Sequence, residues 1–249
     1  MPDATDPLTP RALRARLRAG ETLVGAWSSL PGAATASLIA GVPGLDYVVT
    51  DLQHGAAAEA DLPGISAAVV SRGVTPLARV RSSTEGDVGR ALDLGAQGVF
   101  LPNVRGVDQV AEVLGFCRYA PAGVRSYGRL MPGADDPTRF IVLETREALE
   151  DLDRILELEE LDGVYVGPMD LAYALGHAAT PHDDYMAGII ADVLRRCVDR
   201  KVAAGVHTSE GRAAARYRER GGRLVNALAD SAVLAEAVAV NLRLARERG

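Results

Sequence analysis

Side chains that can do acid–base or metal chemistry stand where apolar segments of this sequence end. Asp51 and His54 follow the run DYVV, Glu144 follows FIVL, and Asp170 closes VYVGPMD. Such groups are costly to bury unless they are paired or used. Their positions therefore predict a wet, charged site that several strand ends build together.

The two carboxylates Glu144 and Asp170 are the most informative pair. They close two successive apolar segments, and if those segments are neighbouring strands, both carboxylates can reach one point. Two carboxylates that meet repel each other unless a proton or a cation lies between them. One or two carboxylates, completed by water and substrate oxygens, typically hold Mg²⁺ or Mn²⁺. The alternative is helix capping, because each acid also stands just before a helix or turn, where negative charge is favourable.

Arg79 lies within PLARVR, where alternation places it on the same strand face as Arg81. An arginine that points into the interior of a β-barrel, the fold predicted below, requires an anion. A carboxylate substrate bound by two hydrogen bonds would supply this anion. The alternative is an ion pair with a nearby acid, namely Asp51, Asp93 or Glu144. For Arg81 we expect a salt bridge at the rim.

His54 is the natural general base, because the unperturbed pKa of histidine lies near neutrality. Asp51, or Asp93 in the segment ALDLG, would orient its ring. The alternative is a histidine whose ring is satisfied by backbone groups. His207, at the end of a later apolar run, is a weaker candidate for the same role. Two other histidines lie in an irregular segment and are expected at the surface: His177 and His182.

Apolar β-type runs alternate with amphipathic helical stretches along the chain, after an initial helix expected at about 9–19. Near-continuous apolar strands that alternate with helices are typical of a parallel sheet covered on its outer face. Eight such units in 249 residues match a (β/α)8 barrel, which brings the carboxyl ends of all strands to one rim. The eight runs are ETLVGAWSSL, LDYVVTDLQH, TPLARVR, AQGVFLPNV, RFIVLET, DGVYVGPMD, VAAGVHT and RLVNAL.

A doubly wound open sheet is the second choice, but it usually carries a glycine-rich fingerprint after its first strand, and GAWSSLPGAA is not one. The length and the hydrophobic content of 48% fit a single barrel domain over residues 1–249 with a short N-terminal helix. The longest irregular stretch, 126–139, is expected to be a mobile loop near the mouth of the barrel.

Composition excludes several classes of partner. The net charge of −6 gives no attraction for nucleic acid or for an anionic membrane surface. No apolar stretch is long enough to span a membrane, and the first residues lack the apolar core of a signal peptide. Cys117 and Cys197 have no CxxC partner, so we expect free thiols in a reducing cytoplasm.

Taken in order, six segments resemble one family: DLQHG, PLARVR, ALDLGAQGVFLPNV, YAPAGVRSYG, LETREAL and GVYVGPMDLAYALG. From about Leu23 to its C-terminus, the chain resembles the metal-dependent class II pyruvate aldolases of the 4-hydroxy-2-oxoheptanedioate aldolase and citrate lyase β-subunit group. The resemblance implies a TIM barrel of the phosphoenolpyruvate/pyruvate type, usually assembled as a hexamer or trimer with C-terminal helices exchanged between subunits.

The same resemblance implies roles for individual residues. Glu144 and Asp170 would hold a divalent ion, Mg²⁺ or Mn²⁺, with Co²⁺ as a further candidate. Arg79 would bind the oxo acid, and His54 would transfer a proton when an aldol adduct of pyruvate and an aldehyde is cleaved or formed. The pyruvate pocket would be shaped by Gly167, Pro168 and the backbone around Met169.

Lysine usage supports a metal-dependent mechanism, because a Schiff-base aldolase requires a lysine at the C-terminal rim. The only lysine, Lys201, stands just before the seventh predicted strand, at the opposite end of the barrel. A metal is then the remaining way to stabilise an enolate.

Three departures from the family pattern put the ordinary substrate in question: Gln53 replaces a frequent acid, Val142 replaces a frequent glutamine, and the stretch between Arg125 and Phe140 is short. Two rival functions stay open: a lyase or hydrolase for CoA thioesters, and a barrel without catalysis that serves as a binding subunit.

Overall fold

The computed structural model describes residues 9–128, 130–131, 134–177 and 183–247. At its centre eight parallel strands form a closed barrel, in which β8 pairs back to β1. This confirms the predicted (β/α)8 barrel and rejects the open sheet. The strands are β1 (Leu23–Ser28), β2 (Tyr47–Asp51), β3 (Thr75–Arg79), β4 (Gly98–Leu101), β5 (Thr138–Leu143), β6 (Gly163–Val166), β7 (Ala203–Val206) and β8 (Leu224–Ala229).

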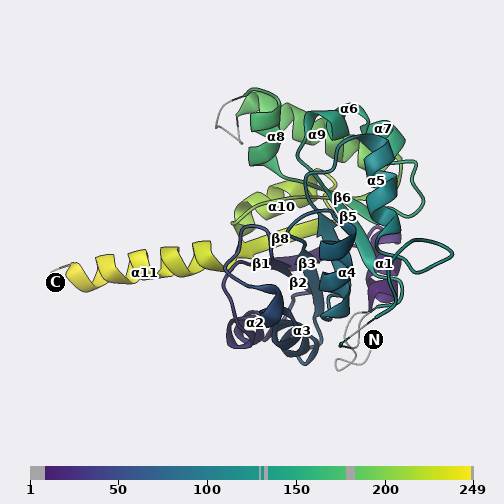
Figure 1. Ribbon diagram of the computed structural model, residues 1–249. Coiled ribbons are helices and arrows are strands. Elements are labelled where there is room, and N and C mark those ends of the chain that lie inside the picture. The colour runs from purple at the N-terminus through teal and green to yellow at the C-terminus, as the bar shows by residue number, and fades with distance from the viewer. Residues whose placement is uncertain (1–8, 129, 132–133, 178–182, 248–249) are drawn as a thin grey trace.

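Helices connect the strands and surround the barrel, as Figure 1 shows. The first helix precedes β1 at the expected place, and the Thr9 side chain caps it by accepting a hydrogen bond from the Ala12 backbone nitrogen at 3.2 Å. The helices are α1 (Pro10–Arg18), α2 (Ala33–Ala40), η1 (Glu59–Asp61), α3 (Leu62–Val70), α4 (Glu85–Asp93), α5 (Gly106–Gly115), α6 (Arg146–Glu150), α7 (Leu152–Ile155), α8 (Pro168–Ala174), α9 (Asp184–Asp199), α10 (Gly211–Glu219) and α11 (Asp230–Arg246).

Aromatic side chains fill the interior of the barrel. Trp27 stacks on Tyr165 with ring centroids 5.4 Å apart, and Phe100 meets Tyr165 edge-on at 5.0 Å. Tyr47 fits into this cluster because Gly25 faces it: a Cβ atom at Gly25 would come within 2.0 Å of the Tyr47 ring. Aromatic rings therefore occupy the barrel interior below the level at which the strands end.

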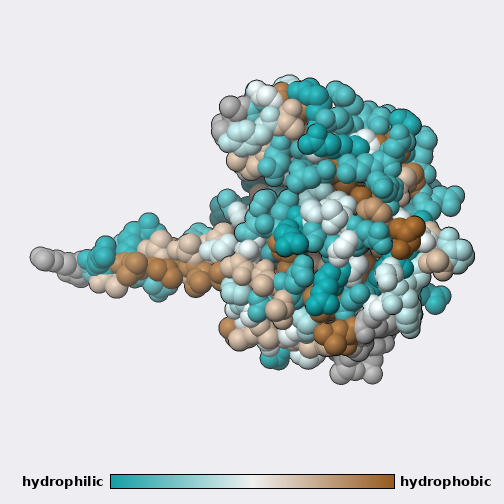
Figure 2. All heavy atoms as spheres, viewed as in Figure 1, coloured by the Kyte–Doolittle hydropathy of each residue, from teal (hydrophilic) through white to brown (hydrophobic). Residues whose placement is uncertain are grey.

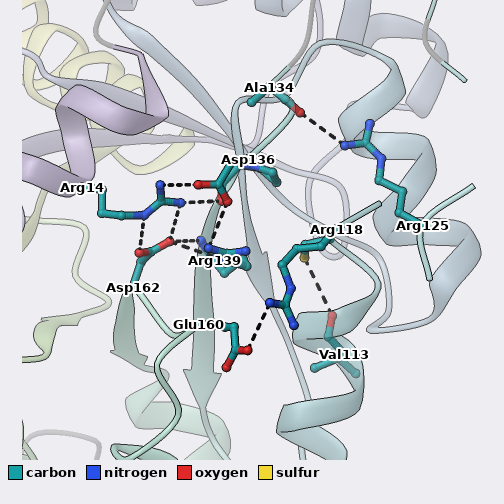
Figure 3. A network of polar contacts seen from close by, with 11 residues as sticks. Arg14, Val113, Arg118, Arg125, Ala134, Asp136, Arg139, Glu160 and Asp162 are labelled. Atoms are coloured by element: carbon teal, nitrogen blue, oxygen red, sulfur yellow. Dashed lines mark hydrogen bonds and ion pairs between the residues drawn. The ribbon is translucent and has the colours of Figure 1, made fainter. Parts of the chain in front are cut away.

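Helix α1 closes the N-terminal end of the barrel. Leu13 is fully buried there, and Arg14 forms ion pairs with Asp162 at 2.6 Å and with Asp136 at 2.7 Å (Figure 3). Asp162 directly precedes β6, and it also accepts a hydrogen bond from the backbone nitrogen of Arg139 at 2.9 Å. These contacts tie α1 to the beginnings of β5 and β6.

The described part of the segment 126–139 lies at this N-terminal end, which corrects the expected position near the mouth. The backbone nitrogens of Leu130 and Met131 donate to the Asp93 carbonyl at 3.1 and 3.2 Å, while Asp136 is held by Arg14. The cause is topological, since the segment leads into β5 and must reach the start of that strand. Residues 129 and 132–133 lie outside the described residues.

Helix α11 projects away from the barrel (Figure 1), and Figure 2 shows apolar residues along it. Asp230 anchors its first turn by accepting hydrogen bonds from the Ser29 backbone nitrogen at 2.8 Å and the Leu30 backbone nitrogen at 3.1 Å. A groove of about 690 Å³ beside the base of the helix is lined mainly by apolar residues of α2, β8 and α11. Five large apolar side chains of α11 are 44–58% exposed: Val233, Leu234, Val238, Leu242 and Leu244.

In the part of the chain that the structure describes, no helix combines the length and the apolar character needed to cross a membrane.

Candidate active site

A cavity of about 60 Å³ lies where the strands end at the C-terminal rim of the barrel. The strands β1, β3, β5, β6 and β7 and the start of α8 supply its walls. Six residues expected at the site from the sequence line it: Arg79, Glu144, Gly167, Pro168, Met169 and Asp170. The remaining lining residues are Trp27, Val142, Tyr165 and His207.

Glu144 follows β5 and is only 4% exposed. Its Oε1 accepts a hydrogen bond from the backbone nitrogen of Asn103 at 2.7 Å, which fixes the carboxylate at the cavity wall. Burial raises the pKa of Glu144 to about 6; the hydrogen bond from Asn103 opposes this shift, and the negative charge of Asp170 adds to it. The carboxylate is therefore held in a place where a nearby cation would stabilise its charged form.

Asp170 lies in the first turn of α8, is exposed, and lines the same cavity as Glu144. Among the described residues there is no cluster of three or more His, Cys, Asp or Glu that could enclose a metal. Two carboxylates fit a divalent ion of the Mg²⁺ or Mn²⁺ kind, whose other ligands are water and substrate oxygens. They do not fit a closed structural zinc site, which needs four protein ligands.

Gly167 makes room for the Glu144 carboxylate. A Cβ atom at this position would lie 3.0 Å from Glu144 Oε2 and 3.3 Å from Glu144 Cβ. Any larger residue would push the buried carboxylate, so the glycine that precedes α8 is part of the way the site positions Glu144.

Arg79 ends β3, opposite Asp51 in β2, and the two side chains form a bidentate ion pair. Arg79 Nε donates to Asp51 Oδ1 at 2.9 Å, and Nη2 donates to Oδ2 at 2.5 Å. Of the two interpretations left open by the sequence, the structure thus shows the ion pair. The guanidinium also lies over the Trp27 ring, 5.2 Å from its centroid, and still lines the cavity.

Asp51 is held at the centre of a hydrogen-bond network. Besides Arg79 it accepts hydrogen bonds from Trp27 Nε1 at 3.2 Å and from the backbone nitrogens of Gln53 at 3.1 Å and His54 at 3.2 Å. Burial alone would raise the pKa of Asp51, but the hydrogen bonds and the positive charge of Arg79 outweigh it and hold that pKa below its usual value. Asp51 is therefore a stable anion that positions Arg79.

The structure does not bring all predicted residues into the cavity. His54 is exposed and does not line the cavity, and its contact with Asp51 runs through the backbone rather than the ring. Asp93 ends α4 at the other end of the barrel, where Arg125 Nη2 donates to it at 2.7 Å; this corrects the expected position beside His54. The cause is that Asp93 follows the helix after β3 rather than β3 itself. At the rim, Arg81 pairs with Asp87 at 2.8 Å, which confirms the predicted salt bridge.

Sequence reasoning missed Trp27 and gave His207 only as a weaker candidate for the general base, although a period of two would have placed both in the cavity. Trp27 stands two positions after Gly25, and His207 two positions after Gly205, and both glycines face the interior of the barrel. The His207 ring meets Trp27 edge-on at 4.8 Å. Burial lowers the pKa of His207 to about 4, the charge of Arg79 lowers it further, and the acids Asp51 and Asp170 oppose both.

Lys201 lies just before β7 and shares a hollow with Arg14 and Asp162 at the N-terminal end of the barrel. The only amine side chain of this sequence is thus at the opposite end from the cavity, as predicted.

Comparisons with known proteins find relatives that cover most of this chain. The 4-hydroxy-2-oxo-heptane-1,7-dioate aldolase of Shigella flexneri is 28% identical over 240 residues, which are 91% of this chain and 90% of that protein. The hydroxypyruvate/pyruvate aldolase of Roseobacter denitrificans is 31% identical over 92% of this chain and 94% of its own. The crystal structure of an HpcH/HpaI aldolase/citrate lyase family protein from Burkholderia cenocepacia superposes with a TM-score of 0.87 at 26% identity, covering 95% of this chain and 99% of the other.

The sequence model of the HpcH/HpaI aldolase/citrate lyase family matches residues 24–237, so this chain belongs to that family.

Proposed function

We propose that this protein is a divalent-metal-dependent aldolase that cleaves or forms 4-hydroxy-2-oxo acids by way of a pyruvate enolate. The observation that carries the proposal is the meeting of Glu144, Asp170 and Arg79 at one small cavity at the C-terminal rim. Two relatives that share most of the chain are aldolases of small oxo acids. The reaction is a carbon–carbon bond cleavage, and the partners are a small oxo acid and an aldehyde.

Glu144 and Asp170 would hold the ion, Mg²⁺ or Mn²⁺ with Co²⁺ as a further candidate, because they are the two carboxylates that line the cavity. When bound, the ion would supply positive charge for the negative charge that develops on the oxo acid. Gly167, Pro168 and Met169 shape the wall beside it and limit the space left for the substrate.

Arg79 would bind the oxo acid at its carboxylate end. Nε and Nη2 are already bound to Asp51, which fixes the plane of the guanidinium and leaves the positive charge facing the cavity. A preformed cation of this kind loses little conformational entropy when the substrate arrives. Asp51 acts as a positioning residue in this scheme, because it contacts Arg79 rather than the cavity.

His54 would remove the hydroxyl proton of the aldol adduct, directly or through a water molecule. Its backbone nitrogen is tied to Asp51 while its side chain is exposed beside the rim. A histidine with access to solvent can exchange protons with bulk water between turnovers.

The test is proton exchange at the methyl group of pyruvate. Protein loaded with Mn²⁺, Mg²⁺ or Co²⁺ is incubated with pyruvate in D2O, and loss of the methyl proton signal is followed by NMR. We expect exchange that stops with chelator and in Glu144→Gln, but continues in the control His177→Asn, because the His177 ring pairs with Asp183 and does not line the cavity. Absence of exchange with all three ions would refute the proposal, and cleavage of malyl-CoA instead would favour the CoA-thioester rival.

We also infer that the protein works as a homo-oligomer, a hexamer or a trimer, in which α11 of one copy packs on a neighbouring copy. Support comes from the exposed apolar side chains of α11 and from the groove of about 690 Å³ at its base. Light scattering coupled to size-exclusion chromatography tests the assembly. A cytoplasmic location completes the proposal, supported by two buried free thiols, Cys117 and Cys197.

A further inference from the structure

Of the histidines that the structure describes, only His207 lines the cavity, and the proposed mechanism gives it no role. It follows β7, and its backbone nitrogen donates to the Val166 carbonyl at 2.9 Å, which fixes the strand end beside α8. The contacts of its ring are with aromatic rings: Trp27 at 4.8 Å and Tyr165 at 6.2 Å, both edge-on. Within the described part of the chain, these contacts leave both ring nitrogens for a ligand.

The surroundings of His207 keep its ring uncharged at neutral pH. Burial and the positive charge of Arg79 both act against protonation, and the acids Asp51 and Asp170 only partly offset them. A neutral imidazole presents one N–H donor and one lone-pair acceptor. It therefore matches a hydroxyl group, which also donates and accepts, better than a carboxylate, which only accepts.

The cavity wall around His207 is mainly apolar, so the ring nitrogens of His207 can discriminate between polar and apolar groups of a substrate. Trp27, Tyr165 and Val142 are each at most 2% exposed and offer mainly apolar surface to the cavity. A substrate methyl group placed against the ring nitrogens would leave them without partners, and unpaired polar groups in such places are costly. Sites that hydrogen-bond a substrate hydroxyl reject the analogue that lacks it far more strongly than apolar pockets reject an extra methyl group.

We propose that His207 is a specificity-determining residue that hydrogen-bonds a hydroxyl group of the substrate, so that the enzyme prefers hydroxylated substrates to their methyl analogues. This inference rests on the proposed aldolase function, because it concerns what the same cavity accepts. The substrate class is a short hydroxyaldehyde or a 3-hydroxy-2-oxo acid.

Two pairs of nearly isosteric substrates test the inference. Glycolaldehyde is compared with propanal as the acceptor of pyruvate, and hydroxypyruvate is compared with 2-oxobutanoate as the donor to one common aldehyde. We expect the ratio of kcat/KM for the hydroxyl and methyl members to exceed tenfold in at least one pair. The ratio should fall at least fivefold in His207→Leu and stay partly preserved in His207→Asn, which keeps a donor and an acceptor. The surface control His177→Leu should leave it unchanged.

A binding measurement separates failure of this inference from failure of the aldolase proposal, because it needs no turnover. In protein labelled with ¹⁵N-histidine, the His207 signals are identified by their loss in His207→Leu. We expect them to shift with hydroxypyruvate more than with 2-oxobutanoate, even if no aldol product forms. A wild-type ratio below twofold in both pairs, or equal shifts with both oxo acids, overturns the role of His207. If the wild-type protein shows neither metal-dependent turnover nor methyl proton exchange, but the His207 signals shift as expected, only the aldolase proposal is overturned.

Discussion

The buried pair of Asp51 and Arg79 gives the sharpest test of how this site is held. Asp51 is 2% exposed and accepts hydrogen bonds from Trp27, from Arg79 and from two backbone nitrogens. Asp51→Asn keeps the size of the side chain, but it removes the negative charge and turns one acceptor oxygen into a donor. Arg79 would then lose its directly bound carboxylate and keep only the charges of Glu144 and Asp170 at the cavity, beside Trp27 and other apolar groups.

The expected loss follows from the burial of both partners. The side chains of Arg79 and Asp51 are 12% and 3% exposed, so solvent screens their interaction weakly. Removing one partner of a buried ion pair typically costs about 3–5 kcal/mol, because it leaves the other charge uncompensated. The contact of Arg79 with the cavity lets some water reach it, so we expect the lower end, about 3 kcal/mol of unfolding free energy.

The pH dependence has a definite sign. The native pKa of Asp51 is lowered, so this residue contributes stability that is complete above its unfolded pKa, near 3.9, and is lost as the pH falls through the lower native pKa. The difference between wild type and Asp51→Asn should therefore be constant from about pH 5 to pH 7 and shrink below about pH 4.

Urea unfolding followed by the fluorescence of Trp27, the single tryptophan, measures these differences. The second variant, Asp51→Asn with Arg79→Met, removes both charges and keeps an unbranched stem in place of the arginine. It should recover about 1–2 kcal/mol relative to Asp51→Asn alone. A loss below about 1 kcal/mol in the single variant, or a double variant less stable than the single one, would refute the electrostatic explanation.

Three further predictions address other parts of the molecule. Gly167→Ala should weaken Mn²⁺ binding by about tenfold in calorimetry, equivalent to about 1.4 kcal/mol, because the added Cβ would lie 3.0 Å from Glu144 Oε2. In the helical control Gly188→Ala the added Cβ meets nothing within 4 Å, so the Mn²⁺ affinity should equal that of the wild type. An unchanged Mn²⁺ affinity in Gly167→Ala would contradict this prediction. In metal-free protein, His207 should lower the unfolding free energy by up to about 3 kcal/mol between pH 6.5 and pH 4. The native pKa of His207, about 4, lies below its unfolded pKa, so protons bind preferentially to the unfolded chain. In urea titrations, His207→Leu should reduce the change of unfolding free energy with pH, and an unchanged pH dependence would exclude His207 as its cause. Leu234→Glu places a charge on the exposed apolar side of α11 and should shift the oligomer toward smaller species in light scattering, whereas an unchanged mass would argue against contact through this helix.

The architecture was predictable because the signal for it is local and repeated. Each apolar run is followed by a helical stretch, and a parallel barrel is the simplest way to bury eight such runs. The segment 126–139 shows where pattern alone misled: its glycine and proline content did not indicate the end of the barrel at which its described residues lie, nor that Thr138 and Arg139 already belong to β5. That end is set by its position before β5.

The candidate site was predictable to the extent that it depends on strand ends. Glu144 and Arg79 stand at the carboxyl ends of their strands, and both reach the cavity. Asp93 was misplaced because it ends a helix; Gly95 just after it has φ +104°, a left-handed turn typical of a helix end. The register of β2 against β3 decides whether Arg79 pairs with an acid or is left unpaired for a substrate. This register places Arg79 opposite Asp51, and it cannot be read from the sequence.

The balance of charge at the cavity supports the proposal that a cation and an oxo acid bind there together. Glu144, Asp170 and Asp51 bring three carboxylates against the single guanidinium of Arg79, and Asp51 already occupies two of its nitrogens. A carboxylate substrate would meet a net negative surrounding, and the pKa of Glu144, which burial raises most, is raised further by the charge of Asp170. A divalent ion held by Glu144 and Asp170 would offset the excess negative charge and leave Arg79 as the attractive group for the anion. The neutral ring of His207 does not alter this balance, which leaves it free to discriminate between uncharged groups of the substrate.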